Sequence, residues 1–505
     1  MTTKGAEFHV NTYTTNQQTV PRVARAPNGD FVIVWQSNVG TGYTPDYEVF
    51  ARRYGSSGAA LGGAFRVNTY TTSVQKSPAV AIAGTGDFIV VWVGSGPGGA
   101  NSGAFFQRYA SAGTPLGGEF RINAHSMNIQ ADPSVGADPS GNFVVAWADG
   151  YDNFRAHARR FSSAGGFLGA EFTVPTTVAT TLSFFRSAVG VGQTGDFVIV
   201  WDQSDTSNPG IGYDVFLRRF TSAGVSLTSD MQVNTYTSGK QNRPQIAMDG
   251  SADFVIVWRD GYPNGHITGK RYNNIGNPLG GDFRVNSQTT AYPRDNPSVA
   301  SDSAGNFVVV WQSLGYPGDG SLNIIGRLFN ANGSPRGSEF RVNDYSNNAQ
   351  RSPWVAMDTS GNFVAAWEDQ DQEGAGVAGI FARRFCPNLV GVTINLTSGS
   401  TNICPGQAGG TLVVTDDGGG TVGHQWGYRT MSGGTVTDLG GQTGPSYVLN
   451  TGNALPGGLS YVVCTSVPGC GSITVSNEIA VFKGDVTAPS VSAPPGATAQ
   501  QTLCQ

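Results

Sequence analysis

The stretch PSVASDSAGNFVVVWQS, residues 297–313, decides the fold of this chain because it contains one complete β-hairpin. Its two arms, PSVAS (297–301) and NFVVVW (306–311), are rich in the β-branched and aromatic residues typical of strands. The four residues between them end in a glycine, which can supply the positive φ of a tight turn. Nearly the same hairpin occurs seven times in 505 residues, each time ending on a tryptophan.

The tryptophans give the repeat its length. They are Trp35, Trp92, Trp147, Trp201, Trp258, Trp311 and Trp367, at spacings of 57, 55, 54, 57, 53 and 56 residues. Each copy has four strand-like segments, which in the sixth copy are DFRVN (282–286), PSVAS, NFVVVW and IIGRLF (324–329). Four short strands per 50–60 residues predict an all-β protein, a seven-bladed β-propeller over residues 1–386.

The order of strands within a blade follows from side-chain size. The segment of PSVAS type alternates a branched residue with Ala or Gly, as expected of strands that approach closely around a narrow central channel. We therefore expect this segment innermost and the EFxVN segment outermost. The seventh copy ends at Phe385 without an outer strand of its own, so residues 7–11 are predicted to complete it and close the ring.

Charge and hydropathy exclude two classes of partner. The net charge of −5 provides no basic surface for nucleic acid. No run approaches the roughly 18 apolar residues that cross a bilayer, so no membrane insertion is expected. The amino terminus, MTTKGAEF, has no signal-peptide pattern, and we interpret the chain as a monomeric piece of a longer exported protein.

Features that recur in every copy are predicted to be architectural. A third-strand arginine, expected to pair with a carboxylate or a backbone carbonyl, recurs at Arg53, Arg108, Arg160, Arg219, Arg271, Arg327 and Arg384. The Asp or Asn after the hairpin glycine recurs in the same way.

Features that differ between copies mark the candidate site. The segments after each tryptophan and those leading into each innermost strand vary, and both should lie on one face of the disc. Their Tyr and Asp residues could stack on sugar rings and accept hydrogen bonds from hydroxyl groups; alternatively, they form ordinary turns. The candidates are Tyr43, Asp46, Asp149, Tyr151, Asp205, Tyr213, Asp260, Tyr262, Tyr316 and Asp319.

One acidic stretch is a candidate Ca²⁺ site. Asp369, Asp371 and Glu373 alternate before Gly374, as in the first half of a calcium-binding loop. The bidentate acid expected at the twelfth position is Ile380, so a solvated acidic turn is the alternative. No other cofactor is expected.

The last quarter of the chain has a different character. Residues 387–484 alternate strand-like segments with Gly-rich turns over about 100 residues, which predicts an immunoglobulin-like β-sandwich. Residues 485–505 read as a linker and the start of a further module. All five cysteines lie between Cys386 and Cys504, which favours disulfides and an oxidising compartment.

Both parts resemble known bacterial sequences. NICPGQ (402–407) and VPGCGSITVSNEIAV (467–481) resemble immunoglobulin-like modules, and that resemblance implies a Cys404–Cys470 disulfide, with Cys464 as the rival partner. The propeller copies resemble an uncharacterised repeat of large bacterial exported proteins. The resemblance implies an extracellular or cell-surface location and lends no activity.

Three functions remain open at this point. The five histidines are scattered among different copies, and no catalytic motif is present. We therefore predict a non-enzymatic binding or adhesion module for a glycan or a surface protein. The alternatives are a polysaccharide-acting hydrolase on the same face, which a cluster of acids with raised pKa would favour, and a passive spacer.

Overall fold

The computed structural model describes residues 5–40, 46–96, 103–124, 129–176, 186–204, 212–261, 265–287, 294–315, 320–345, 349–370, 372–374 and 376–386, together with the backbone of further strands at Thr2–Thr3 and between Thr393 and Lys483. The chain divides into two compact units, Thr3–Cys386 and Pro387–Gln505 with Met1–Thr2. No helix in the described part of the chain has the length and apolar character needed to cross a membrane.

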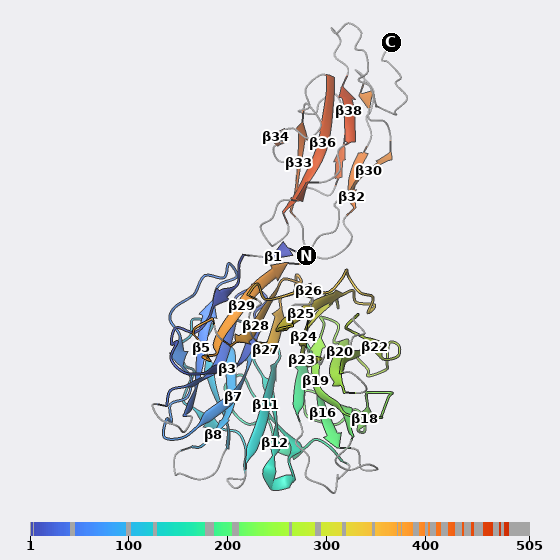
Figure 1. The fold of residues 1–505 in the computed structure, drawn as a ribbon. Helices are drawn as coiled ribbons and strands as arrows, with labels where there is room; N and C mark the ends of the chain where they lie inside the picture. The colour runs from blue at the N-terminus through green and yellow to red at the C-terminus, as the bar shows by residue number, and fades with distance from the viewer. Residues whose placement is uncertain are drawn as a thin grey trace. The chain divides into compact units, whose positions relative to one another are not determined.

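The first unit is the predicted seven-bladed propeller of four-stranded antiparallel sheets (Figure 1). The first three blades are β3 (Gln18–Arg25), β4 (Phe31–Asn38), β5 (Tyr47–Tyr54) and β6 (Phe65–Arg66); β7 (Gln75–Ile82), β8 (Phe88–Gly94), β9 (Gly103–Tyr109) and β10 (Phe120–Arg121); and β11 (Gln130–Ala137), β12 (Phe143–Asp149), β13 (Arg155–Phe161) and β14 (Phe172–Thr173). The next three are β15 (Ser187–Val191), β16 (Phe197–Ser204), β17 (Tyr213–Phe220) and β18 (Met231–Gln232); β19 (Gln241–Met248), β20 (Phe254–Asp260), β21 (His266–Tyr272) and β22 (Phe283–Arg284); and β23 (Arg294–Ser301), β24 (Phe307–Leu314), β25 (Leu322–Phe329) and β26 (Phe340–Arg341). The seventh is β27 (Gln350–Met357), β28 (Phe363–Asp369), β29 (Gly379–Cys386) and β2 (Phe8–His9). The one described helix is the 3₁₀ turn η1 (Gly150–Asp152).

The ring closes as the sequence predicts. β2 pairs antiparallel with β29, with Phe8 opposite Ala382 and His9 opposite Phe381. The innermost strands of neighbouring blades pack together all the way round, from β3 against β7 to β27 against β3. The amino-terminal strand therefore completes the last blade.

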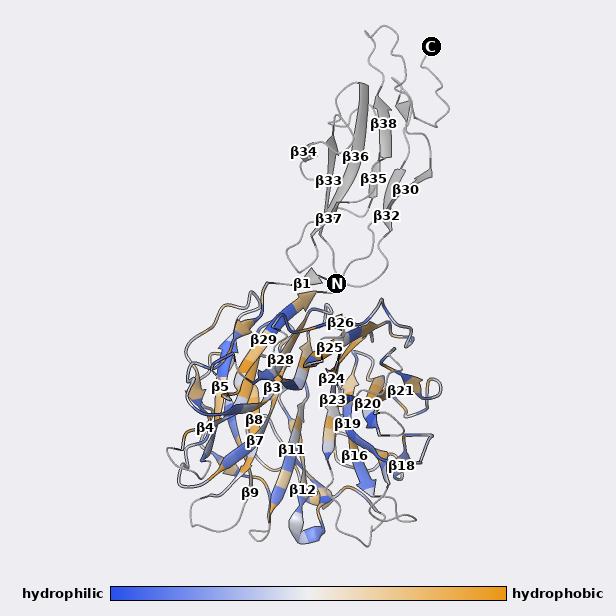
Figure 2. Cartoon of the chain, viewed as in Figure 1, coloured by the Kyte–Doolittle hydropathy of each residue, from blue (hydrophilic) through white to orange (hydrophobic). Residues whose placement is uncertain are grey.

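The core lies between blades. The seven tryptophans are all at most 1 % exposed. One buried cluster joins Ile89 and Val91 of the second blade to Phe143 and Trp147 of the third, and similar clusters lie between other blades. Figure 2 shows the hydrophobic residues along the strands of the propeller. This is the burial that a single sheet could not provide for both of its faces.

The recurring arginines hold neighbouring blades together. Arg271 donates one bond to Leu279 O within its own blade and another to Ala331 O in the next blade. The prediction of backbone-carbonyl partners is confirmed, with the bond to the next blade made by Arg53, Arg108, Arg160, Arg219, Arg271 and Arg384.

Arg327 does not belong to that series. It stands one residue earlier in its strand and bonds to Val285 O of the previous blade, whereas Leu328 occupies the series position. The reason is the closure itself. In the other blades this arginine bonds to the link between the third and outer strands of the next blade. The seventh blade takes its outer strand from the amino terminus and has no such link, so an arginine at Leu328 would have no carbonyl there to bind.

The second unit contains β30 (Thr393–Ser398), β31 (Asn402–Ile403), β32 (Thr411–Thr415), β33 (Gly423–Arg429), β34 (Thr437–Asp438), β35 (Ser446–Val448), β36 (Gly458–Val467), β37 (Thr474–Val475) and β38 (Ile479–Lys483). They form a β30-β32-β35 sheet and a sheet centred on β36, β33 and β38. The immunoglobulin-like assignment stays a prediction. Cys386 is buried and disulfide-bonded, while Cys404 and Cys470 lie outside the described residues.

Candidate functional site

The strand ends that lead into the variable segments lie at one face of the propeller, as the first blade shows. In the first blade Gln18, at the start of the innermost strand, pairs with Ser37 at the end of the second strand. Asn38 then pairs with Tyr47 across the connection after the tryptophan. We call the side where these segments meet the loop face.

Five of the ten predicted ligand-binding residues lie in the described part of the chain, so the predicted set stays a prediction. Of these five, Asp46, Tyr213 and Asp260 lie in the first, fourth and fifth blades, whereas Asp149 and Tyr151 share the third. Tyr151 is 57 % exposed whereas Asp149 is fully buried. The other candidates, Tyr43, Asp205, Tyr262, Tyr316 and Asp319, lie outside the described residues.

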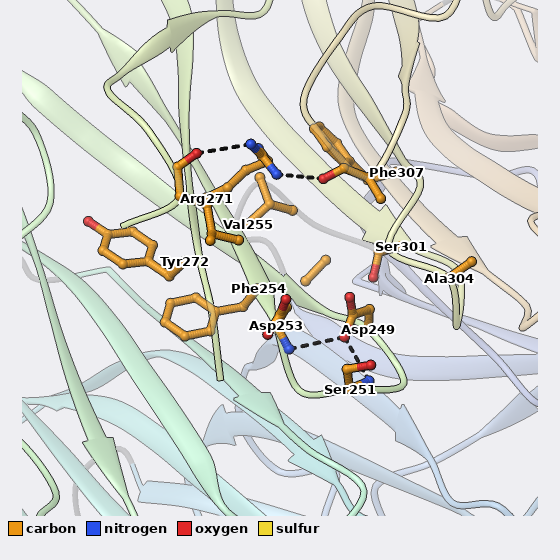
Figure 3. Close-up of a pocket in the computed structure, with 14 residues that line it drawn as sticks. Asp249, Ser251, Asp253, Phe254, Val255, Arg271, Tyr272, Ser301, Ala304 and Phe307 are labelled. Atoms are coloured by element: carbon orange, nitrogen blue, oxygen red, sulfur yellow. Dashed lines mark hydrogen bonds between the residues drawn. The ribbon is translucent and has the colours of Figure 1, made fainter. Parts of the chain in front are cut away.

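A small cavity of about 210 Å³ lies between the fifth and sixth blades (Figure 3). Its polar groups belong to the repeat. The Asp249 carboxylate accepts bonds from the backbone N–H groups of Ser251 and Asp253, and Arg271 bonds to two carbonyls. Because these bonds recur in other blades, we assign this cavity to the architecture.

The second cavity, of about 540 Å³, is lined by Glu7, His9, Thr14, Gln372, Glu373 and Phe381. We call it the blade-7 pocket. It lies where the amino-terminal strand meets the segment after β28. Its volume falls within the range of small-ligand sites, whereas the cavity between blades five and six falls below it.

Hydrogen bonds hold both carboxylates of the blade-7 pocket in place. Glu7 accepts from Asp344 N at 2.7 Å and from Gln372 Nε2 at 2.8 Å. Glu373 Oε1 accepts from Asn11 Nδ2 at 2.6 Å and contacts His9 Nε2. Its other oxygen, Glu373 Oε2, is buried and has no hydrogen-bond partner among the described residues.

His9 lies at the solvent side of this group. Its side chain is 34 % exposed, while that of Glu373 is 3 % exposed. The imidazole stacks on the Phe381 ring, with centroids 4.9 Å apart. The pocket therefore combines an accessible imidazole, a buried carboxylate behind it and a second carboxylate nearby.

A glycine makes room for this arrangement. Gly379 occupies the position of Glu48 in the first blade and Asp214 in the fourth. A Cβ on Gly379 would lie 2.4 Å from Glu373 Oε1. The second blade also has a glycine at this position, Gly103, so Gly379 by itself is a weak sequence signal for the pocket.

The predicted Ca²⁺ site is not tested by these contacts. Asp369 is fully buried at the end of β28, and Asp371 lies outside the described residues. One oxygen of Glu373 is already bonded within the pocket. The Ca²⁺ site stays a prediction.

Acids with raised pKa do not gather in one place. Burial raises the pKa of four acids, and it raises the pKa of Asp202 to about 6. The four are Glu48, Asp202, Asp249 and Glu368, which belong to the first, fourth, fifth and seventh blades respectively. Asp202 and Glu368 accept backbone N–H groups from the next blade. The acid cluster that would favour a hydrolase is therefore not found among the described residues.

No protein-family model matches the chain, and no curated protein matches it. Several solved structures are similar to it at low identity. A polysaccharide lyase described as an ulvan lyase has a TM-score of 0.48 at 10 % identity, covering 76 % of this chain and 95 % of its own. A protein of unknown function from Dyadobacter fermentans has a TM-score of 0.46 at 11 % identity, covering 75 % and 97 %. The NanB sialidase from Streptococcus pneumoniae has a TM-score of 0.42 at 10 % identity, covering 75 % and 70 %.

These likenesses correct one prediction. The structural neighbours are mostly enzymes, including sialidases, the lyase and an arabinofuranosidase, which contradicts the predicted non-enzymatic adhesion module. The hydrolase alternative agrees better with this set. At such low identity and TM-score the likenesses establish no activity, and the propeller rests on the strand pairing of this chain. The resemblance to an exported repeat stays a prediction.

Proposed function

We propose that this chain is a polysaccharide-acting hydrolase whose active site is the blade-7 pocket. The observation that carries the proposal is the pairing of His9 with Glu373 in a 540 Å³ cavity that also holds the Glu7 carboxylate. Glycoside hydrolysis needs one group to protonate the leaving oxygen and one carboxylate to activate water or attack the sugar.

The roles follow from exposure and bonding. His9 is more accessible than Glu373 and would donate its proton to the glycosidic oxygen, with Glu373 stabilising the imidazolium. Glu7, held by Asp344 N and Gln372, would accept a proton from water as the water attacks the anomeric carbon. One water molecule is added across the glycosidic bond, which breaks, and the products are two shorter sugar chains with one new reducing end.

The proposal includes a glycan substrate and an extracellular location. Phe381 lines the pocket, and its ring stacks on His9 and so orients the imidazole toward a bound sugar. Large polysaccharides occur outside cells, so a site of this kind would act there.

The test is a reducing-end assay of the purified chain on a panel of neutral, acidic and sulfated polysaccharides. We expect activity on at least one substrate, and a loss of 100-fold or more in His9→Ala and Glu7→Gln. Gln232→Ala is the matched control, because Gln232 holds the position of His9 in the fourth blade. No activity across the panel, or equal activity in His9→Ala, would exclude this function.

A further inference from the structure

The third blade departs from the repeat at two neighbouring positions. In the other blades the outer strand ends in an asparagine whose Oδ1 accepts a backbone N–H from the third strand: Asn11, Asn68, Asn123, Asn234, Asn286 and Asn343. The third blade has Pro175 at this position and His157 where the first, second, fourth and seventh blades have phenylalanine. Glu171 and Asp149 hold positions where other blades also have acids, such as Glu119 and Asp260, but only in the third blade does a histidine lie between them.

The side chains that gather here are Asp149, Asp152, His157 and Glu171. One ligand atom each from Asp149, His157 and Glu171 lie within 4.8 Å of one another. The His157 Nδ1 and Glu171 Oε1 atoms are 3.0 Å apart, and His157 Nε2 lies 3.0 Å from Asp152 Oδ2.

Each carboxylate has one oxygen fixed and one directed to the cluster. Asp149 Oδ1 accepts from Gln130 Nε2 and Tyr151 N, while Asp149 Oδ2 is completely buried and has no hydrogen-bond partner in the described part of the chain. Glu171 Oε2 accepts from Ala124 N, and its Oε1 faces His157. Outer bonds of this kind orient the ligands of protein metal sites.

Three carboxylates, Asp149, Asp152 and Glu171, surround His157. Arg155 bonds to Asp152, and Arg159 interacts electrostatically with Glu171. The Asp149 side chain has no exposure to solvent. A buried carboxylate without a counter-charge is costly, and a bound cation would remove that cost.

We propose that Asp149 Oδ2, His157 Nδ1 and Glu171 Oε1 bind a divalent transition-metal ion, for which Zn²⁺ is the test ion. Mixed imidazole and carboxylate donors suit Zn²⁺ better than Ca²⁺. Ligand bonds of 2.0–2.2 Å place tetrahedral ligand atoms about 3.4 Å apart. The 3.0 Å contact between His157 and Glu171 would widen slightly, and ligand atoms that lie up to 4.8 Å apart would move closer. The Nε2–H of His157 then donates to Asp152, the outer-shell bond expected of a metal-bound histidine.

Zinc content and calorimetry test this site in the full chain. After treatment with a chelator and exchange into Zn²⁺, the wild type should hold one zinc more than Asp149→Asn, Glu171→Gln and His157→Gln. Zinc should raise the melting temperature of the wild type and leave that of the three variants unchanged. Comparing variants matters because the cysteines and His9 offer other places for zinc.

The matched control is Asp260→Asn. Asp260 holds the position of Asp149 in the fifth blade and accepts the same glutamine bond, from Gln241 Nε2. This variant should keep the wild-type zinc content. Zinc content unchanged in folded Asp149→Asn and His157→Gln would overturn the site, and binding of Ca²⁺ in place of Zn²⁺ would overturn the ion class. Three variants are used so that failure of one to fold leaves the test intact.

Discussion

At the scale of the residue, repetition separates architecture from chemistry. A group present in most blades, such as the asparagine that ends the outer strand, makes the same backbone bond each time. A group that breaks the pattern has no such task. His9 and His157 are departures of this kind, and each lies in one of the two proposed sites. The acids beside them, Glu7 and Glu171, hold a position that is acidic in other blades too. The sequence shows these departures, but it does not show which of them meet in space.

Asp202 is a buried carboxyl whose titration should be visible in the stability of the protein. It accepts the backbone N–H groups of Arg186 and Arg243 at 2.8 and 2.9 Å. Burial raises its pKa from 3.8 to about 6, against the opposing effect of those two bonds. The folded state therefore holds this proton more tightly than the unfolded state does.

The sign of the pH dependence follows from this. Asp202 contributes most below pH 4, and its contribution falls as the pH rises from 4 through 6, by about 3 kcal/mol in total. Asp202→Asn should remove this part of the slope; the first blade already uses a neutral amide, Gln36, as the equivalent acceptor. Denaturant unfolding at pH 4.5 and 7 measures the difference, and an identical pH dependence in the variant would contradict the assignment.

At the scale of the element, the hairpins and strand order were predictable, but one distortion was not. The innermost strand has a residue with positive φ directly before its proline, at Val20, Ser77, Asp132, Arg243, Asn296 and Ser352. A proline disfavours the α conformation in the residue before it, but an ordinary extended backbone would satisfy this restriction as well as a positive φ does. What selects the bulge is a partner in the neighbouring blade, as when Val20 N donates to Glu368. A local pattern contains no information about such a partner.

The arginine contacts between blades make a prediction about paired substitutions. Arg271 bonds to Ala331 O and packs against Gly333, whose φ is +82° and whose added Cβ would lie 2.7 Å from Arg271 Nε. Arg271→Leu should cost about 1–2 kcal/mol of the free energy of unfolding by removing charged hydrogen bonds. Gly333→Ala should cost about as much, through the steric contact and the left-handed backbone.

The two costs should not add, because removing the guanidinium also removes the clash. In Arg271→Leu/Gly333→Ala, the alanine should cost only the backbone part, about 1 kcal/mol. Chemical denaturation of the four proteins measures this coupling. Leu328 is the natural precedent for leucine at this position. Strict additivity would show that Arg271 does not hold the sixth blade.

At the scale of the whole molecule, closure was predictable from counting, and the blade-7 pocket was not. Six complete copies and one copy lacking its outer strand require a strand from elsewhere, and residues 7–11 were the only unused segment of the right type. The pocket depends on His9 and Glu373, which are 364 positions apart. Their contact results from closure together with the path of one connecting segment, and periodicity specifies only the first of these.

The closing strand should open more readily than its equivalents, and Asn11 and Asn234 allow a matched comparison. Asn11 Oδ1 accepts from Ile380 N, and its Nδ2 donates to Tyr13 O and Glu373. Asn234 makes the equivalent bonds to Val215 N, Tyr236 O and Asp214. Both are nearly fully buried, so replacing either with alanine should cost a similar 1–3 kcal/mol.

Chain connectivity should distinguish the two variants. In the fourth blade the outer strand follows its neighbour within a short connection, so an opened strand closes again quickly. In the seventh blade, β2 and β29 come from opposite ends of the propeller sequence. Closing an opened β2 must therefore bring together residues more than 360 positions apart. We therefore expect hydrogen exchange in β29 to quicken more in Asn11→Ala than exchange in β17 does in Asn234→Ala, at matched global stability. Equal protection of the two strands would mean that the closing strand does not open separately from the rest of the ring.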